Sequence, residues 1–202
     1  MSKIICISNQ KGGAGKSTIA FNLAYALKNG LSVALIDTDL QGSLTSLLLM
    51  MDGIKLLPLP DNLEDLKKFT EDILIIDTPP YLSTNLINLF EISDYILIPT
   101  KASFFDVMAI RATITLLRQA QTRGSKVKSA ILLNMINPRT VLTDQIINLL
   151  KEHSIPILVT QINERISYVR SLLNGGVVNS KDKKSKAEIL NLADEILNNI
   201  TD

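Results

Sequence analysis

Eight consecutive residues near the start of the chain combine glycines with two lysines and two hydroxyl side chains. The run reads Lys11, Gly12, Gly13, Ala14, Gly15, Lys16, Ser17 and Thr18. Glycines let the backbone curve so that successive N–H groups point inward around a phosphate. In a loop of this kind Lys16 would reach the β- and γ-phosphates, and the Ser17 hydroxyl would bind Mg²⁺. The run therefore predicts a site for a nucleoside triphosphate and Mg²⁺.

The loop departs from the usual pattern, G-x-x-x-x-G-K-[ST], at one position. Gln10 stands where that spacing places the first glycine, and Lys11 enters the loop instead. A glycine-rich turn without a ligand is the alternative interpretation. The loop joins an apolar run to a helical pattern, and a helix N-terminus favours anions, so the setting favours the phosphate site.

Carboxylates follow two further apolar runs. Asp37 and Asp39 end the run Ile36-Asp37-Thr38-Asp39, and Asp77 begins Asp77-Thr78-Pro79-Pro80. Any one of them could be a helix cap. Ligands in open α/β sheets bind beyond the carboxyl ends of the strands, so all three would converge on the loop, where carboxylates position Mg²⁺.

The elements that must hold these residues alternate along the chain. Apolar runs predict strands at 4–8, 33–37, 73–77, 95–99, 127–134 and 157–162. Helical patterns cover 17–29, 61–69, 105–123, 143–153, 164–174 and 186–200, with a short stretch after Gly42. Continuous apolar strands separated by helices indicate a doubly wound α/β fold. We expect one domain, residues 1–202, with a mostly parallel sheet and helices on both faces.

Composition excludes several classes of site. Cys6 is the only cysteine and His153 the only histidine, so no internal disulfide, cysteine-held cluster or histidine-based metal site is expected. Cys6 lies in an apolar run, which predicts a core residue. No signal peptide is recognised, and no apolar stretch approaches the roughly 20 residues that cross a bilayer. The expected location is cytoplasmic.

Charge is distributed unevenly. Residues 1–99 carry a net −4, residues 100–186 a net +9 and residues 187–202 a net −4, although the whole chain carries only +1. The basic segment indicates either one electropositive face or an ordinary solvated surface.

Three strings together resemble a known family. They are N-Q-K-G-G-A-G-K-S-T, with its second lysine at Lys11, D-T-D-L-Q-G at 37–42 and I-I-D-T-P-P at 75–80. They are similar to the deviant-Walker-A ATPases of the ParA/MinD family of P-loop proteins, and most similar to small ParA-type partition ATPases. The family often has a proline where this chain has Leu40, which leaves the carboxylates intact.

The resemblance implies roles for the matching positions. Lys11 would reach the phosphates of a partner across an ATP-bound homodimer, and Lys16 would bind phosphates within its own chain. Ser17, Asp37 and Asp77 would hold Mg²⁺, and Asp39 would position the attacking water. The remaining assignments are Thr18 at the α-phosphate, Thr78-Pro79-Pro80 as a γ-phosphate switch, and Asn134, with Pro138 nearby, on the adenine side.

The resemblance also implies partners. The ATP dimer would bind DNA without sequence preference, and a ParB-like centromere-binding protein would stimulate ATP hydrolysis on the nucleoid. Candidate DNA contacts are Arg165, Arg170, Lys181, Lys183, Lys184 and Lys186, although the lysines could instead form a solvated flexible loop.

Other members of the superfamily give alternatives. A MinD-like membrane-cycling ATPase would need a C-terminal amphipathic helix with a basic polar face, whereas residues 187–202 carry an acidic one. A nitrogenase-reductase-like protein would need cluster cysteines, and a related tyrosine kinase would have a terminal tyrosine cluster. A scaffold without turnover is disfavoured because Lys16 and Asp39 are present.

Overall fold

A six-stranded parallel sheet forms the centre of the molecule, in the order β3-β2-β4-β1-β5-β6. The computed structural model describes residues 2–38, 53–81, 85–137 and 142–201. The strands are β1 (Lys3–Ile7), β2 (Val33–Asp37), β3 (Lys55–Leu57), β4 (Ile73–Asp77), β5 (Tyr95–Thr100) and β6 (Lys128–Leu133).

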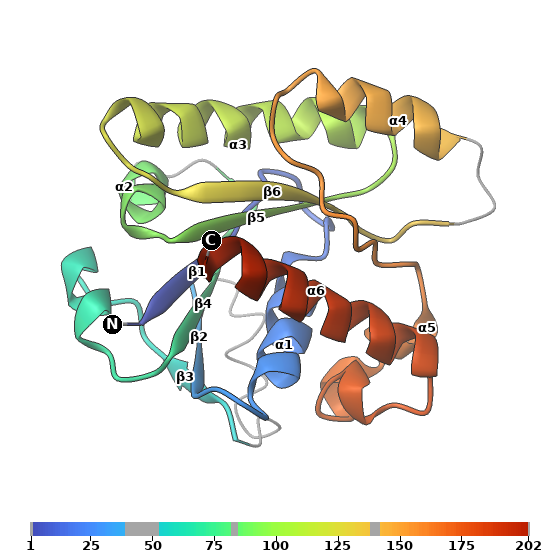
Figure 1. Ribbon diagram of the computed structural model, residues 1–202, viewed down its shortest axis with the longest axis horizontal. Helices are drawn as coiled ribbons and strands as arrows, with labels where there is room; N and C mark the ends of the chain where they lie inside the picture. Colours follow the sequence, from blue (N-terminus) through green and yellow to red (C-terminus); the bar gives the residue numbers. More distant parts are fainter. Residues whose placement is uncertain (1, 39–52, 82–84, 138–141, 202) are drawn as a thin grey trace.

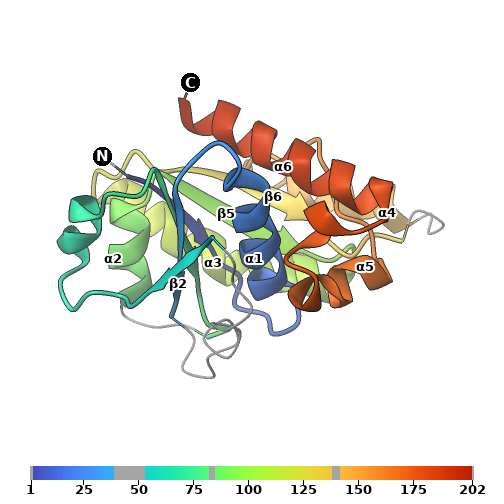
Figure 2. The ribbon, with the colours of Figure 1, turned by 90° about the horizontal axis from the view of Figure 1, so that it is seen from below.

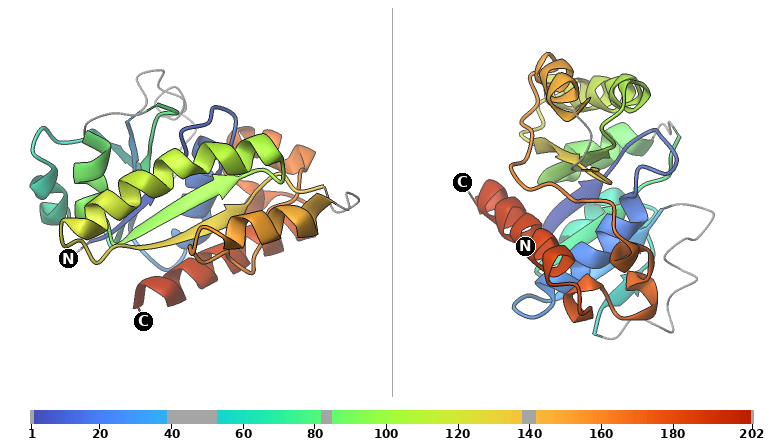
Figure 3. Two further views of the ribbon diagram at one scale, coloured as in Figure 1. Left: turned by 90° about the horizontal axis from the view of Figure 1, so that it is seen from above. Right: turned by 90° about the vertical axis from the view of Figure 1, so that its right-hand side faces the viewer.

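Helices cover both faces of this sheet. The α-helices are α1 (Lys16–Leu27), α2 (Asn85–Ile92), α3 (Phe104–Thr122), α4 (Leu142–Lys151), α5 (Ile166–Val169) and α6 (Lys183–Thr201). Short 3₁₀ helices are η2 (Leu63–Lys68), η3 (Ser171–Leu173) and η4 (Val177–Asn179). Figure 1 and the right-hand view of Figure 3 show α3 and α4 on one side of the sheet and α1 and α6 on the other. Figure 2 shows α1 beside α6, which contact each other.

Alternation along each strand divides the core into two layers. Ile5 and Ile7 of β1 pack with α1 and α6, while Ile4 and Cys6 pack with α2 and α3. Successive side chains of a strand point to opposite faces, and here both faces are apolar. Cys6 is fully buried, as predicted. The predicted doubly wound α/β fold is therefore confirmed.

The predicted strand at 157–162 is wrong. The segment runs beside β6, where Leu158 N–H donates to the Ile131 carbonyl and Ile162 N–H to the Leu133 carbonyl, both at 2.9 Å, but it forms only isolated bridges near its two ends. Between them, the backbone N–H groups of Val159 and Thr160 donate to the Glu195 carboxylate of α6, at 2.7 and 2.9 Å. The hydrogen bonds to β6 are interrupted at these residues, so the segment does not form a continuous strand. The sixth strand is instead β3, a short edge strand without an apolar run.

Three helix predictions also need correction. The helix predicted at 61–69 is the 3₁₀ helix η2, which is capped by the Asn62 side chain. The helix at 164–174 is divided into α5 and η3, and α2 was not predicted. Helix α6 begins at Lys183, so three of the candidate basic residues lie in its first turn and not in a loop. The helical stretch predicted after Gly42 lies outside the described residues.

Candidate functional site

The glycine-rich loop connects β1 to α1 and has a defined shape without any ligand. Gly13 and Gly15 have φ values of 73° and 86°, in the left-handed region that favours glycine. Gly15 caps α1, and its carbonyl accepts the first helical bond, from Ile19 N–H at 2.9 Å. The helix N-terminus therefore follows the loop directly, as an anion site requires.

Two side-chain amides fix the loop from either side. Asn9 Nδ2 donates to the Pro99 carbonyl of β5 at 2.7 Å, and Asn9 Oδ1 accepts from Lys11 N–H at 2.9 Å. Asn134, just after β6, donates from Nδ2 to the Ala14 carbonyl at 2.8 Å. Both asparagines are buried. They attach the loop to β5 and β6, so the phosphate site is already organised.

The loop lysines differ in their contacts. Lys16 is buried, and its Nζ donates to the Lys11 carbonyl at 3.4 Å, so its ammonium group folds back along the loop. Lys11 Nζ instead forms an ion pair with Asp106 Oδ1 of α3 at 2.7 Å. Ser17 and Thr18 follow Lys16 in the first turn of α1.

The predicted metal carboxylates lie side by side. Asp37 of β2 and Asp77 of β4 are direct partners in the sheet register, and Asp77 also pairs with Ile7 of β1. The side chain of Thr38 donates to the Asp77 carbonyl at 2.8 Å, and that of Thr78 donates to the Ile7 carbonyl at 2.9 Å. These bonds hold three strand ends together immediately before the loop.

Asp77 is completely buried, and its carboxylate acts electrostatically on the thiol of Cys6. Burial, followed by the carboxylate of Asp77, raises the pKa of the Cys6 thiol. Carboxylate and hydroxyl oxygens are the donors that Mg²⁺ prefers, so Asp37, Asp77 and Ser17 fit this ion. Asp39, predicted to position water, lies outside the described residues, as does Pro138.

A small pocket begins at the loop and includes residues that the sequence did not reveal. Its volume is about 120 Å³. It is lined by Thr18, Asn134 and Met135, and by residues from 162–169, notably Asn163 and Tyr168. No motif in the sequence distinguishes Met135, Asn163 or Tyr168. Asn134 therefore borders this pocket while also fixing the loop.

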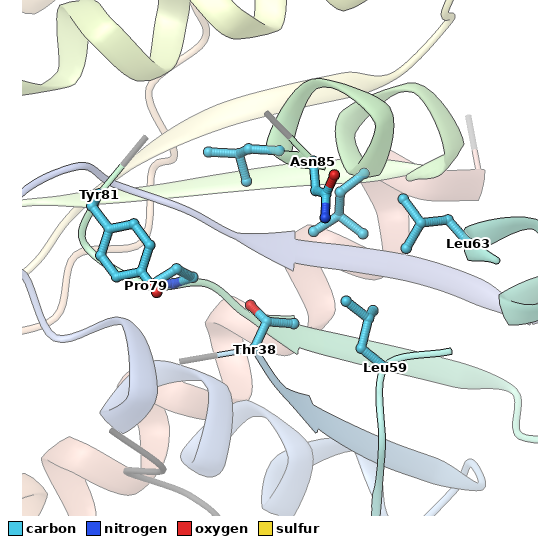
Figure 4. Close-up of a pocket in the computed structure, with 8 residues that line it drawn as sticks. Thr38, Leu59, Leu63, Pro79, Tyr81 and Asn85 are labelled. Carbon is cyan, nitrogen blue, oxygen red and sulfur yellow. The ribbon is translucent and has the colours of Figure 1, made fainter. Parts of the chain in front are cut away.

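A second pocket, of about 230 Å³, lies beside the strand ends. Figure 4 shows Thr38, Pro79 and Tyr81 at its edge, together with Leu59, Leu63 and Asn85. Among the residues that the structure describes, its lining contains no charged side chain. Such a surface does not suit a triphosphate, so the phosphate site is assigned to the loop.

Comparison with known proteins agrees with this geometry. A family model described as the CobQ/CobB/MinD/ParA nucleotide binding domain matches residues 5–178. The chain belongs to this family. The resemblance inferred from the loop and the strand ends is thus confirmed at the family level, and the CobQ/CobB/MinD/ParA match includes the loop, both carboxylates and α5.

The relatives that this chain is similar to are named for the distribution or partition of a cargo. The chain is 27% identical over 206 residues to maintenance of carboxysome distribution protein A of Halothiobacillus neapolitanus, covering 96% of this chain and 95% of that protein. It is 27% identical over 188 residues to the chromosome-partitioning ATPase Soj of Thermus thermophilus, covering 74% of this chain and 76% of that protein.

Solved structures confirm the family fold. A plasmid partition protein of Borrelia burgdorferi bound to AMPPNP superposes with a TM-score of 0.80 at 22% identity, covering 98% of this chain and 100% of that one. The septum site-determining protein MinD of Pyrococcus horikoshii, complexed with Mg-ADP, gives 0.76 at 19% identity, covering 97% and 96%. In the described part of the chain, no helix has the length and apolar character needed to cross a membrane.

Proposed function

We propose that this protein is a Mg²⁺-dependent ATPase that dimerises with ATP and positions or segregates a cargo. The observation that carries the proposal is the register of the site. The clamped loop after β1 lies beside Asp37 and Asp77, which end the two neighbouring strands at the same level. Hydrolysis of a phosphate anhydride needs this combination of backbone amides, a lysine and carboxylates in one place.

Each residue then has a defined task. The N–H groups of residues 12–15 and the Lys16 ammonium bind the β- and γ-phosphates, and Thr18 contacts the α-phosphate. Ser17, Asp37 and Asp77 hold Mg²⁺, which when bound neutralises charge on the phosphate oxygens. Asp39 orients the attacking water. Asp39→Ala should therefore trap an ATP-bound dimer, and unchanged turnover in that variant would place the water-positioning role elsewhere.

Dimer formation gives Lys11 its role. The lysine lies outside the usual P-loop pattern, and it is part-exposed beside the phosphate site. We assign it to the phosphates of a second subunit, where a cation stabilises charge that develops during transfer.

Basic residues around α5 and α6 form the proposed DNA surface. Arg170, Lys181, Lys183, Lys184 and Lys186 are exposed. Three of these lysines occupy the first turn of α6, where the helix dipole disfavours cations. That turn contains no acidic residue of its own, although Asp182 just before it accepts from the N–H groups of Lys184 and Ser185. Arg170 and Lys181 line one open groove with Arg165, and the same groove includes the acidic residues Glu164 and Asp182. Clustered positive charge of this kind favours a polyanion such as duplex DNA.

Arg165 has a different role from its neighbours. Its guanidinium forms an ion pair with Glu188 of α6 at 2.9 Å, and this bond together with the nearby charge raises the pKa of Arg165. An arginine committed to an internal carboxylate contributes to the fold first. We therefore remove it from the proposed DNA contacts and keep the exposed residues.

The cargo is either DNA, as the names of the partition relatives suggest, or a protein compartment, as the carboxysome relative suggests. In both cases a separate adaptor, ParB-like if the cargo is DNA, would link cargo to the ATPase and stimulate hydrolysis. Membrane cycling is the alternative. The apolar face of α6 supports DNA over lipid, because Ile189, Leu192 and Ile196 are fully buried in the core.

The deciding experiment is co-sedimentation of the protein with duplex DNA or with anionic phospholipid vesicles, each with ATP, with ADP and without nucleotide. We expect the protein to sediment with DNA of any sequence in the presence of ATP, and not with ADP or without nucleotide. That result would support a nucleoid-bound ATPase over a membrane-cycling one. Retention by vesicles without retention by DNA would overturn the proposal and favour the membrane-cycling function.

A further inference from the structure

The ion pair between Lys11 and Asp106 connects the phosphate loop to α3. Lys11 Nζ lies 2.7 Å from Asp106 Oδ1, and the two side chains are 36% and 4% exposed. Among the residues that the structure describes, Lys11 is the only cation paired with this carboxylate. The negative charge of the nearly buried Asp106 is thus neutralised by Lys11, which reaches it from the partly exposed loop.

Asp106 also takes part in the start of α3. Ser103 is the N-cap: its hydroxyl accepts from Asp106 N–H at 3.2 Å and donates to Asp106 Oδ2. This reciprocal arrangement resembles a capping box, which needs a hydrogen-bonding side chain at this position but does not need a negative charge. The cap therefore explains Oδ2, whereas the contact between Oδ1 and Lys11 requires another reason.

We propose that Asp106 is a positioning residue that holds Lys11 within its own subunit and so sets the threshold for ATP-dependent dimerisation. This inference rests on the proposed role of Lys11 at the phosphates of a partner. In this proposal Lys11 exchanges its contact with Asp106, in its own subunit, for contacts with the nucleotide of the second subunit. Its departure exposes Asp106 to the cost of a buried charge without a counter-ion.

The consequence is that the ion pair between Lys11 and Asp106 disfavours dimerisation when no nucleotide is bound. The negative charge of a bound triphosphate replaces the carboxylate of Asp106 as the counter-ion of Lys11. A diphosphate carries less negative charge and therefore stabilises the ammonium group less. Dimerisation then requires both the partner and the γ-phosphate. Removing the charge of Asp106 while keeping its shape should favour dimerisation.

The first test reads the ion pair directly. Nucleotide-free protein is treated with an amine-acylating reagent, and the rate at Lys11 is followed by peptide mass spectrometry. In Asp106→Asn, which keeps an oxygen for Ser103, Lys11 should be acylated severalfold faster than in the wild type. An unchanged rate at Lys11 would overturn the proposal, whatever happens to the dimer.

The second test measures the dimer by light scattering across protein concentrations at saturating ATP. Asp106→Asn should lower the dimer dissociation constant by about tenfold, a typical coupling between two sites. Equal or weaker dimerisation in a folded variant would refute the threshold. If Asp106→Asn does not fold, Asp106→Gln serves the same purpose, because glutamine suits a capping box and carries no charge.

Two controls separate this role from simple stability. Glu71→Gln removes a matched pair far from the loop, Lys55 Nζ to Glu71 Oε1 at 2.6 Å with Glu71 7% exposed, and should leave Lys11 acylation and dimerisation unchanged. Ser103→Ala weakens the cap but keeps the carboxylate, and should leave Lys11 as slow to react as in the wild type.

The failure of the proposed function is distinguishable from the failure of this inference. Wild-type protein that binds ATP but never dimerises, together with a Lys11→Ala variant of unchanged turnover, removes the role of Lys11 in a partner. The proposed role of Asp106 in setting a dimerisation threshold would then be wrong as well. A wild type that dimerises with ATP, beside an Asp106→Asn that behaves identically, removes the threshold alone.

Discussion

Lys16 is the residue on which nucleotide binding most depends. It is buried, and its ammonium already lies along the loop at the Lys11 carbonyl. A hydrogen bond to a charged partner is worth about 1.5–3 kcal/mol, so Lys16→Ala should weaken ATP affinity by roughly 10- to 100-fold. Calorimetric titration with ATP measures this. Lys28→Ala, at the far end of α1, is the control, and wild-type affinity in Lys16→Ala would contradict the assignment.

Gly15 and Gly12 give a matched pair within the loop. A Cβ at Gly15 would lie 2.4 Å from Asn134 Nδ2, on a backbone with φ of 86°, whereas a Cβ at Gly12 meets nothing within 4 Å. Gly15→Ala should therefore lower the free energy of unfolding by about 1–3 kcal/mol, and Gly12→Ala should change it far less. Urea denaturation of the nucleotide-free protein compares them. Equal stability of the two variants would mean that the Asn134 clamp does not form.

Helices α5 and α6 are joined through one carboxylate. Glu188 accepts from Arg165 Nη2 at 2.9 Å, Asn163 Nδ2 at 2.8 Å and the Tyr168 hydroxyl at 3.3 Å. Burial and the charge of Glu188 raise the pKa of Tyr168, so its hydroxyl remains a donor.

Arg165→Ala and Glu188→Ala should each lower the free energy of unfolding by about 1–3 kcal/mol. The double variant should cost less than the sum, because both changes remove the same contact. Arg170→Ala, an exposed neighbour, should alter stability by no more than about 0.5 kcal/mol. Strict additivity in the double-mutant cycle would show that the ion pair contributes nothing to the docking of α5 on α6.

The edge strand β3 is linked to the residues just before β4 by a contact that is sensitive to acid. Lys55 donates to Glu71, and this hydrogen bond holds the pKa of Glu71 below its ordinary value of 4.5. The folded protein therefore takes up this proton less readily than the unfolded chain. The stabilisation is complete above pH 4.5 and is lost as the pH falls through the lowered folded pKa.

Glu71→Gln should accordingly make stability less dependent on pH in the acid range. Urea denaturation at neutral and acid pH compares the variant with the wild type. Asp72, Asp182 and His153, whose pKa values are also lowered, remain in both proteins and contribute to the residual slope. An identical acid response of the variant and the wild type would show that Glu71 does not contribute to the acid sensitivity.

At the scale of the whole molecule, charge distribution predicts the salt dependence of DNA binding. A dimer would bring two basic surfaces to one duplex, and each phosphate contact adds about 0.9 to the slope of log affinity against log salt. Arg170→Ala should reduce that slope by about 0.9 for each subunit that makes the contact, equally for all sequences. Fluorescence anisotropy at several salt concentrations measures it.

Arg111→Ala provides the control, since Arg111 is an exposed arginine of α3 on the other side of the sheet (Figure 1). The two variants should keep wild-type ATPase activity without DNA. An equal loss of DNA affinity in both would indicate a diffuse electrostatic effect and not a defined surface around α5 and α6.

The sequence determined the local features of the site. Gly13 and Gly15 adopt positive φ because glycine has no Cβ, and a loop between a strand and a helix follows from neighbouring residues alone. The ends of β2 and β4 carry Asp37 and Asp77 because apolar runs of strand length end there. Parallel strands bring their carboxyl ends to one edge, so convergence on the loop was predictable.

Only the tertiary structure decided which distant residues meet. Asn134 donates to Ala14 across 120 positions of sequence, and Lys11 pairs with Asp106 of α3. These contacts depend on the crossover connections that place β5, β6 and α3 beside the loop. The strand order cannot be read from the type of any one side chain. The same reason explains the edge of the sheet. The apolar run at 157–162 is bonded to β6 near its two ends but turns to Glu195 of α6 in the middle. The segment Lys55–Leu57, in contrast, pairs with β2 because the fold brings it to that edge.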